Sequence, residues 1–345
     1  MTERVLSHRE LNRATLARQL LLDRRRLSAL HVVQRLAGMQ AQWPAAPYVG
    51  IWSRATSFRR ETLERSILGG AVVKATVMRG TLHLVTRRDY PLFWTALHDI
   101  PSWPDPVAIS DGVRVAGEIR ALALEGPLTA QAALEHLARQ HGLGDLHGRR
   151  VWQVARIRGH IVHAPETALW AARPAAMFRA HAEPEPVGKL VAVTEVVRRY
   201  LSAFGPATRA DIADWSGMRV GDFAAAMDAL EPLRRFRDEQ GRELLDLPRL
   251  PLPSGDTPAP VRFLPKWDNV LLGFADRRRV LPEQYRKAVI AKNGDVAQTV
   301  LVDGVVAGLW RAEQGRVVVE PLAPLPRNVR TEVEDERRRL EVFLR

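Results

Sequence analysis

Cysteine is absent from this 345-residue chain, and its absence excludes several kinds of site at once. Without thiols the protein cannot form disulfides, thiolate zinc sites or iron–sulfur clusters, and it cannot use a cysteine nucleophile. Lysine is also scarce: only five lysines stand among the 51 basic residues, so arginine carries nearly all of the positive charge.

Long apolar runs are missing as well. No stretch approaches the roughly 20 apolar residues that a helix needs to span a bilayer, and the segment Met1 to Glu10 is polar. We therefore expect a cytoplasmic protein. With 46% hydrophobic and 26% charged residues the chain has the balance of an ordered globular protein, and its length predicts two to four packed units.

Positive charge is what the chain has in excess. The formal net charge is +12 and the isoelectric point is near 10.9, which favours a polyanionic partner because basic side chains that contact phosphates release condensed counterions. Nucleic acid is the first candidate partner. The alternative is compositional, because a GC-rich genome also enriches arginine.

The standard catalytic motifs are absent. The sequence has no phosphate-binding loop, no Gly-x-Gly-x-x-Gly after a strand and no Gly-x-Ser-x-Gly elbow. The ten histidines are scattered, and the closest pair, His160 and His163, lies on an extended stretch. We expect neither a metal site nor a cofactor.

The first hundred residues predict helices followed by a β-hairpin. Apolar residues recur first at helical spacing and later in β-branched runs. The expected elements are helices over 11–22, 28–38 and 61–68 and strands over 72–77 and 81–85, with a turn at Arg79-Gly80. Helices joined in this way and followed by a hairpin are typical of a winged helix.

A Gly-Pro-x-Thr turn occurs twice further along the chain, at Gly126 to Thr129 and at Gly205 to Thr208. A helix precedes each copy, and two helices and an extended pair follow it. The expected helices are 112–124, 130–140, 149–158, 191–204, 209–215 and 220–230, and the extended pairs are 161–164 with 168–171 and 236–237 with 243–247. Three tandem winged helices are the economical interpretation, and three unrelated helical segments with stray hairpins are the alternative.

Proline-rich segments mark two boundaries, at Pro101 to Pro106 and at Pro248 to Pro260. Beyond the second, short alternating stretches predict a small β domain, and a charged amphipathic helix over 328–344 closes the chain. The expected strands are 261–264, 270–274, 289–290, 296–302, 305–311 and 317–320. The sequence thus predicts an α+β fold with winged helices at 1–104, 105–183 and 184–250, a β domain at 251–326 and a helix at 327–345.

Two glutamines, Gln40 and Gln42, follow a helix that ends at Gly38. In an extended backbone their side chains point the same way, and paired carboxamides can hold a water molecule or read a base edge. The adjacent Trp43 could stack on a base or act as a wedge. The alternative is a pair of ordinary surface glutamines.

Three segments closely resemble the AlkZ and YcaQ group of winged-helix bacterial DNA glycosylases, and the resemblance covers nearly the whole chain. They are His31 to Gln42, Arg79 to Leu84 and Leu264 to Leu272. The group has three tandem winged helices around a β domain. Its catalytic motif is Gln-x-Gln in the AlkZ-like branch and Gln-x-Asp in the YcaQ-like branch, so Gln40-Ala41-Gln42 places this chain in the AlkZ-like branch.

The resemblance implies a monofunctional glycosylase that hydrolyses the N-glycosidic bond of N7-alkylated purines, including crosslinked ones, in duplex DNA. Gln40 and Gln42 would position water and stabilise an oxocarbenium-like transition state, and no lysine nearby offers a lyase step. An open, concave basic cleft suits a bulky adduct better than a tight base-flipping pocket, and such a cleft needs no partner subunit, so we expect a monomer.

Arg79 and His83 are candidate contacts to phosphate or groove, although His83 could equally be a packed strand residue. Asp268 and Asn269 are expected to shape a turn near the cleft without a catalytic role. The competing function is a winged-helix protein that binds DNA or a lesion without chemistry, and the two hypotheses differ only in whether Gln40 and Gln42 line a groove near the lesion.

Overall fold

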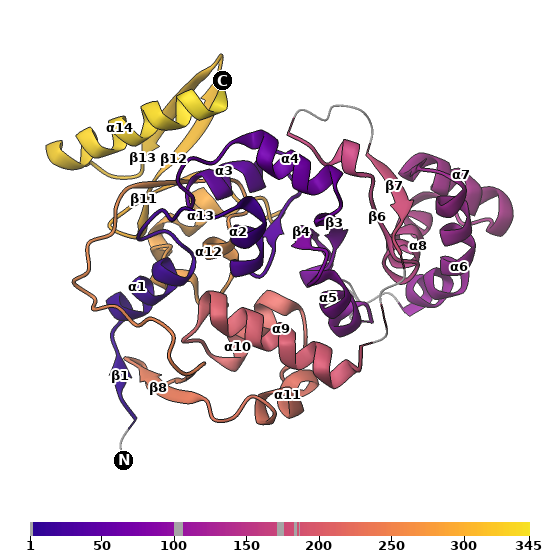
Figure 1. Ribbon diagram of the computed structural model, residues 1–345, viewed down its shortest axis with the longest axis horizontal. Helices are drawn as coiled ribbons and strands as arrows, with labels where there is room; N and C mark the ends of the chain where they lie inside the picture. Colours follow the sequence, from indigo (N-terminus) through magenta and orange to yellow (C-terminus); the bar gives the residue numbers. More distant parts are fainter. Residues whose placement is uncertain (1–2, 100–105, 171–175, 183–184, 186) are drawn as a thin grey trace.

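The computed structural model describes residues 3–99, 106–170, 176–182, 185 and 187–345. Within these ranges helices alternate with four small sheets (Figure 1), which confirms the mixed α+β class. In Figure 1 the first sheet lies near the centre, α6 to α8 form one end of the molecule, α9 to α11 lie below, and the C-terminal helix α14 lies at the upper left.

The first sheet has the strand order β2-β4-β3, all antiparallel. The Ser28 side chain caps α2 by accepting a hydrogen bond from the His31 amide, and Gly38 at φ 90° turns the chain into β2. The elements are α2 (Ala29–Arg35), β2 (Met39–Gln40), α3 (Ala46–Trp52), α4 (Arg60–Leu68), β3 (Val72–Thr76) and β4 (Leu82–Thr86), followed by α5 (Tyr90–Leu97).

The same order of elements occurs again in the second unit. The sheet order β5-β7-β6 repeats the arrangement in which the first strand pairs with the third. The elements are α6 (Pro106–Glu125), β5 (Leu128–Thr129), α7 (Ala130–His141), α8 (Asp145–Arg158), β6 (Ile161–His163) and β7 (Met177–Ala180).

The third unit follows the same order with one reduced strand. Ala207 replaces the first strand by a single bridge to Leu245 in β9. The elements are α9 (Lys189–Phe204), α10 (Arg209–Ser216), α11 (Ala224–Asp228), β8 (Arg234–Asp238) and β9 (Glu243–Asp246), and β1 (Val5–Leu6) adds a parallel strand beside β8. The two units that share the Gly-Pro-x-Thr turn therefore also share the order and pairing of their helices and strands.

The C-terminal region confirms four of the expected strands and the final helix. β10 (Arg262–Leu264), β11 (Thr299–Val302), β12 (Val305–Glu313) and β13 (Arg316–Pro321) form an antiparallel sheet in sequence order. Helix α14 (Arg327–Leu344) packs on β13 and β10, and it buries Val333 and Leu340.

Some expected elements were wrong. The segment 270–274 is not a strand: α12 (Asn269–Leu272) forms there because the Asp268 side chain accepts from the Val270 amide and caps it. A short apolar run fits a buried helix as well as a strand. Val289 likewise ends a helix, α13 (Arg286–Val289), and only Ile290 makes a bridge, to Val296.

The partner of β6 was also misassigned. Ala168 follows a short 3₁₀ turn (Pro165–Thr167), and the strand that pairs with β6 is β7. Ala171, the end of the expected strand, and Pro101 to Asp105, the main part of the expected linker, lie outside the described residues. Helix α3 was missed because nearly all of its residues are buried, so it lacks the amphipathic pattern that reveals a surface helix.

Helix α1 (His8–Arg18) does not belong to the first sheet, although the sequence suggested that it opens the first winged helix. A capping box of Ser7 and Glu10 starts α1. The helix packs against α9 and against the turn at Arg277–Arg279. It therefore joins the third unit to the C-terminal region.

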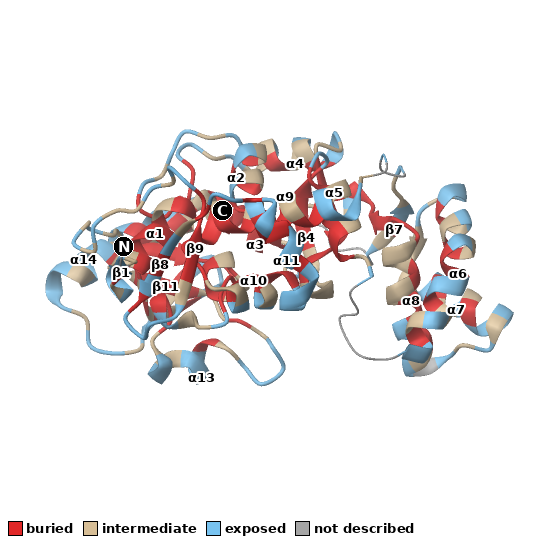
Figure 2. Cartoon of the chain, turned by 90° about the horizontal axis from the view of Figure 1, so that it is seen from below, coloured by how far each residue is buried: buried red, intermediate tan, exposed pale blue. Residues whose placement is uncertain are grey.

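The first sheet is buried on both faces (Figure 2). Val73 and Val85 pack on one side with α5 and α9. Val72 and Leu84 pack on the other side with α2 and α4. Because helices pack on both faces of the sheet, the edge strand β2, which carries Gln40, is held rigidly. Among the described residues no helix is both long and apolar enough to cross a membrane.

Candidate active site

Gln40 and Gln42 lie at the edge of the first sheet and meet each other. Gln40 pairs across the strands with His83, and the Ala41 amide donates to the Leu82 carbonyl at 2.8 Å. This extended backbone turns both carboxamides to the same side, and Gln40 Nε2 donates to Gln42 Oε1. Gln40 is 7% exposed and Gln42 is exposed, so the pair leads from the protein interior to solvent.

Arg79 holds the inner member of the pair. It sits in the turn between β3 and β4 with a left-handed backbone, φ 53°. One guanidinium nitrogen donates to Gln40 Oε1 at 3.0 Å and the other donates to the Trp215 carbonyl at 2.6 Å. Burial lowers the pKa of Arg79 to about 10, which keeps the group charged at neutral pH. The guanidinium therefore fixes which end of the Gln40 amide faces Gln42.

His83 is a packed strand residue in this structure. It is 3% exposed, and its Nδ1 lies 3.0 Å from the Thr81 carbonyl, which requires Nδ1–H to be the donor. Burial and, to a smaller extent, the positive charge of Arg79 lower its pKa to about 3, so the ring is neutral. A direct contact between His83 and DNA stays a prediction.

The C-terminal region forms hydrogen bonds with the loop that leads into β2. Asn269 Nδ2 donates to the carbonyls of Gly38 at 2.7 Å and Leu36 at 3.1 Å. Asp268 caps α12 and accepts two hydrogen bonds from Arg54, at 2.7 and 2.8 Å. These contacts agree with the expected turn-shaping role and also position the strand of Gln40.

Sequence reasoning missed the contacts that converge on the turn Met78–Gly80. The Trp215 carbonyl comes from the end of α10, and Gln153 Nε2 in α8 donates to the Gly80 carbonyl at 3.3 Å. Both partners are more than 70 residues away along the chain. The only sequence signal was an arginine beside a glycine in a tight turn, which says nothing about its partners.

Asp214, one residue before Trp215, is a carboxylate whose charge acts on Arg79. Its side chain is 40% exposed and 3.7 Å from Arg277. Burial raises its pKa, while Arg277 and Arg79 act in the opposite direction. No hydrogen bond joins Asp214 to either glutamine among the described residues, so the site consists of amides and a guanidinium.

Lys74 is the lysine closest to the pair in the sheet. The register places it opposite Leu84, whereas His83 pairs with Ala75 on one side and Gln40 on the other. Alternation along a strand therefore puts Lys74 on the opposite face of the sheet from Gln40. Within the described part of the chain, no group of three or more histidine or acidic side chains could hold a metal ion.

The two amides and the guanidinium can orient a water molecule without gaining or losing a proton. Arg79 donates to Gln40 and Gln40 donates to Gln42, so the chain of hydrogen bonds has one direction. Each amide oxygen keeps a second lone pair for another donor. Because the inner end is anchored by a charge, the outer carboxamide is held in a defined orientation at the surface.

Comparison with known proteins identifies the class of enzyme. The profile of a family described as "DNA glycosylase AlkZ-like" matches residues 33–343. The protein is therefore a DNA glycosylase. More particularly, it belongs to the AlkZ-like family, as the Gln-x-Gln motif predicted.

A curated protein of Streptomyces sahachiroi, an "Interstrand DNA cross-link repair glycosylase", is 27% identical to this chain over 337 residues, covering 88% of this chain and 87% of that protein. The solved structure of the Streptomyces sahachiroi DNA glycosylase AlkZ superposes with a TM-score of 0.79 at 23% identity, covering 96% of this chain and 95% of that structure. The two proteins share a fold over nearly their full lengths.

Proposed function

We propose that this glycosylase hydrolyses the N-glycosidic bond of N7-alkylated purines in duplex DNA and unhooks interstrand crosslinks made by such adducts. The observation that carries the proposal is the hydrogen-bonded pair of Gln40 and Gln42, anchored by Arg79. The crosslink substrate is suggested by the relative from Streptomyces sahachiroi that is described as repairing such lesions.

The chemistry suits neutral amides. Alkylation at N7 puts a positive charge on the base, so the C1′–N9 bond breaks with the electron pair going to a base that leaves neutral. Water adds to C1′ and releases a proton to solvent. The amide oxygens of Gln40 and Gln42 align that water and stabilise positive charge at C1′, which requires no strong general acid.

Arg79 has a positioning role in this proposal. A carboxamide can rotate by 180° and exchange its oxygen with its nitrogen, and a cation that donates to Gln40 Oε1 makes the exchanged orientation unfavourable. Because the same guanidinium donates to the Trp215 carbonyl, the third unit helps to set the orientation of the catalytic amide. The contact of Arg79 with phosphate or groove that the sequence suggested stays the alternative to this role.

DNA binding is proposed to use the three repeated units as winged helices. The proposed domains remain 1–104, 105–183, 184–250, 251–326 and 327–345, around a concave basic cleft. The first and second boundaries fall within segments that the structure does not describe, and β1 and α1, inside the first range, pack against the third unit. Trp43, half-buried beside Gln42, is proposed to stack on a base or wedge into the duplex. His83 is proposed to support the strand, and the enzyme is proposed to act as a monomer.

Single-turnover release of N7-methylguanine from duplex DNA tests the proposal. The double variant Gln40→Ala, Gln42→Ala should lose release while it keeps its affinity for lesion-free duplex. Gln284→Ala, a change at an exposed glutamine, is the matched control. Release by the double variant at the rate of the unmodified protein would refute the catalytic role of the pair, and no release from either N7-methylguanine or a crosslinked duplex would refute the substrate class.

A further inference from the structure

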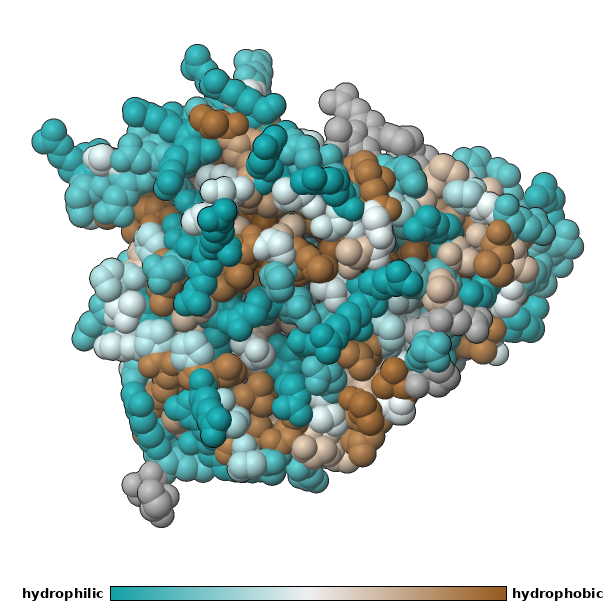
Figure 3. All heavy atoms as spheres, viewed as in Figure 1, coloured by the Kyte–Doolittle hydropathy of each residue, from teal (hydrophilic) through white to brown (hydrophobic). Residues whose placement is uncertain are grey.

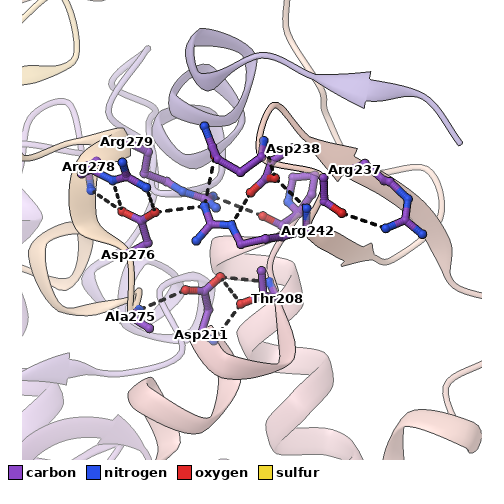
Figure 4. A network of polar contacts seen from close by, with 12 residues as sticks. Thr208, Asp211, Arg237, Asp238, Arg242, Ala275, Asp276, Arg278 and Arg279 are labelled. Atoms are coloured by element: carbon purple, nitrogen blue, oxygen red, sulfur yellow. Dashed lines mark hydrogen bonds and ion pairs between the residues drawn. The ribbon is translucent and has the colours of Figure 1, made fainter.

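Two cavities differ sharply in how their charges are compensated. A cavity of about 580 Å³ lies between the start of α10 and the segment 275–286 and is lined by four arginines and four carboxylates. Figure 4 shows how these charges meet: Asp276 accepts from Arg278, at 2.6 Å, and pairs with Arg242 at 2.9 Å. Arg209 pairs with Glu243 at the same rim. This cavity is internally neutral and offers no free charge to a ligand.

The second cavity, of about 680 Å³, is on the first unit and has positive charge without an acid. It lies between α2, the end of α4 and the end of β4, and is lined by Leu30, Gln34, Gly69, Gly70, Ala71, Thr86, Arg87 and Arg88. Arg87 and Arg88 are exposed. Neither guanidinium makes a hydrogen bond or ion pair with any described residue, so both retain their full donor capacity.

The adjacent carboxylate does not neutralise them. Asp89 is 2% exposed. It accepts hydrogen bonds from Thr86 Oγ1 at 2.8 Å and from Arg199 at 2.9 Å. Its carboxylate is therefore paired with these two side chains and not with Arg87 or Arg88. His181 feels the charge of Arg87, which lowers its pKa in the same direction as the larger effect of burial. The cavity therefore presents two unpaired cations and a neutral amide, Gln34.

The floor of the cavity admits a close approach of backbone to ligand. Gly70 has φ 71°, and a Cβ atom placed there would meet nothing within 4 Å. Gly70 therefore leaves open space in the cavity that Arg87 and Arg88 also line. Arginine forks bind phosphate oxygens in a bidentate manner, so the geometry fits an oxyanion.

We infer that this cavity, the Arg87 pocket, binds a backbone phosphate of duplex DNA, an inference that rests on the proposed function. β4 connects the two sites: Gln40 pairs with His83, and Arg87 follows four residues later. At about 3.3 Å per residue the separation along the strand is roughly 13 Å, which spans about four nucleotides at roughly 3.4 Å of axial rise each.

The salt dependence of binding to lesion-free duplex tests the Arg87 pocket. Each neutralised phosphate contributes about 0.9 to the slope of log Kobs against log salt. The double variant Arg87→Ala, Arg88→Ala should reduce the slope by about 1.8 if each arginine neutralises a phosphate, and by about 0.9 if they share one. Arg87→Lys, Arg88→Lys keeps the charge and should restore the slope.

The matched control is Arg338→Ala, Arg339→Ala on α14. These adjacent arginines are 67% and 70% exposed and already pair with Glu334 and Glu336, so the control removes the same formal charge away from the pocket. An unchanged slope in the Arg87 pocket variant, or an equal fall in both double variants, would overturn the inference, because the second result would report only net charge.

Catalysis provides an independent readout. At saturating protein the rate of single-turnover N7-methylguanine release should stay unchanged in the Arg87→Ala, Arg88→Ala variant, while the protein concentration giving half the maximal rate should rise at least tenfold. A lower rate at saturation would contradict a pure phosphate contact. The salt slope is measured on lesion-free duplex, so an unchanged slope would refute the Arg87 pocket and leave the glycosylase proposal intact. Conversely, loss of the glycosylase proposal would leave the measured phosphate contact intact.

Discussion

The guanidinium of Arg79 lies 3.0 Å from the side-chain oxygen of Gln40, and it reaches that position from a hairpin turn that also accepts a hydrogen bond from Gln153 of the second unit and donates one to Trp215 of the third. The orientation of the inner glutamine therefore depends on how three parts of the chain pack together. A defect far from β2 can change the site without changing any residue of the Gln-x-Gln motif.

Replacing Arg79 by methionine should lower the single-turnover rate of N7-methylguanine release by about 10- to 100-fold, because the lost charge-assisted hydrogen bond is worth about 1.5–3 kcal/mol. The affinity for lesion-free duplex should stay within about twofold, and Arg79→Lys should recover part of the rate. Arg198→Ala, at an exposed arginine paired with Glu195, is the control. A reduced salt slope with an unchanged rate at saturation would instead establish the phosphate contact that the sequence suggested.

The rate of N7-methylguanine release at saturating protein should be independent of pH between about 6 and 9. Neither glutamine titrates, His83 has a pKa of about 3 and Arg79 has a pKa of about 10, so the site keeps one charge state over this range. Single-turnover rates at half-unit pH intervals provide the measurement. A sigmoidal profile would reveal a general acid or base, and Asp214→Asn would then identify or exclude Asp214 as that group.

Asp268→Asn should destabilise the protein by about 3–5 kcal/mol, since it leaves the buried Arg54 without its counter-charge. The side chains are 0% and 1% exposed and are joined by two hydrogen bonds. Urea unfolding at pH 7 measures the change. Glu313→Gln, which breaks an exposed pair with Arg311, should change stability by less than about 1 kcal/mol.

Replacing His163 by leucine should weaken the acid sensitivity of the protein. Burial lowers the pKa of His163 to about 2, and the charges of Lys74 and Arg156 lower it too, whereas the unfolded chain titrates near 6.5. The unfolded state therefore binds a proton that the folded state does not, and stability falls as the pH drops below 6.5.

Urea unfolding between pH 6 and pH 4 measures that slope. It should decrease by about 1.4 kcal/mol per pH unit in His163→Leu. At pH 7 the variant should be at least as stable as the unmodified protein, since neither ring nitrogen has a hydrogen-bond partner among the described residues. An equal slope in the two proteins would show that His163 is protonated in the folded state.

The face of the molecule seen in Figure 3 bears on the choice of control positions. Hydrophilic side chains cover most of this face, including the C-terminal helix at the upper left, while apolar side chains gather in its lower part. Polar side chains that could affect DNA affinity are thus not confined to one site on this face. Effects of single arginines on DNA affinity must be compared with a variant of equal charge, as in the Arg338→Ala, Arg339→Ala control.

Much of the architecture could be predicted because it is local. Ser28, Thr129 and Thr208 cap helices through their own side chains, and the β-branched run 72–77, the turn at Arg79-Gly80 and the run 81–85 predicted a hairpin. The same local rule put Gln40 and Gln42 on one side of β2. Short apolar runs such as 270–274 were misassigned, because burial on all sides removes the periodicity that separates helix from strand.

The sequence by itself determined the family, the repeated order of elements, the positive charge and the paired carboxamides, since each depends on residues close together in the chain. Only the tertiary structure decided that Arg79 donates a hydrogen bond to Gln40, that His83 is neutral and packed, and that Asn269 holds the loop before β2. These outcomes depend on partners such as Trp215, 136 residues from Arg79. The physical reason is that desolvation and hydrogen-bond geometry are properties of the packed chain, and no spacing in the sequence encodes them.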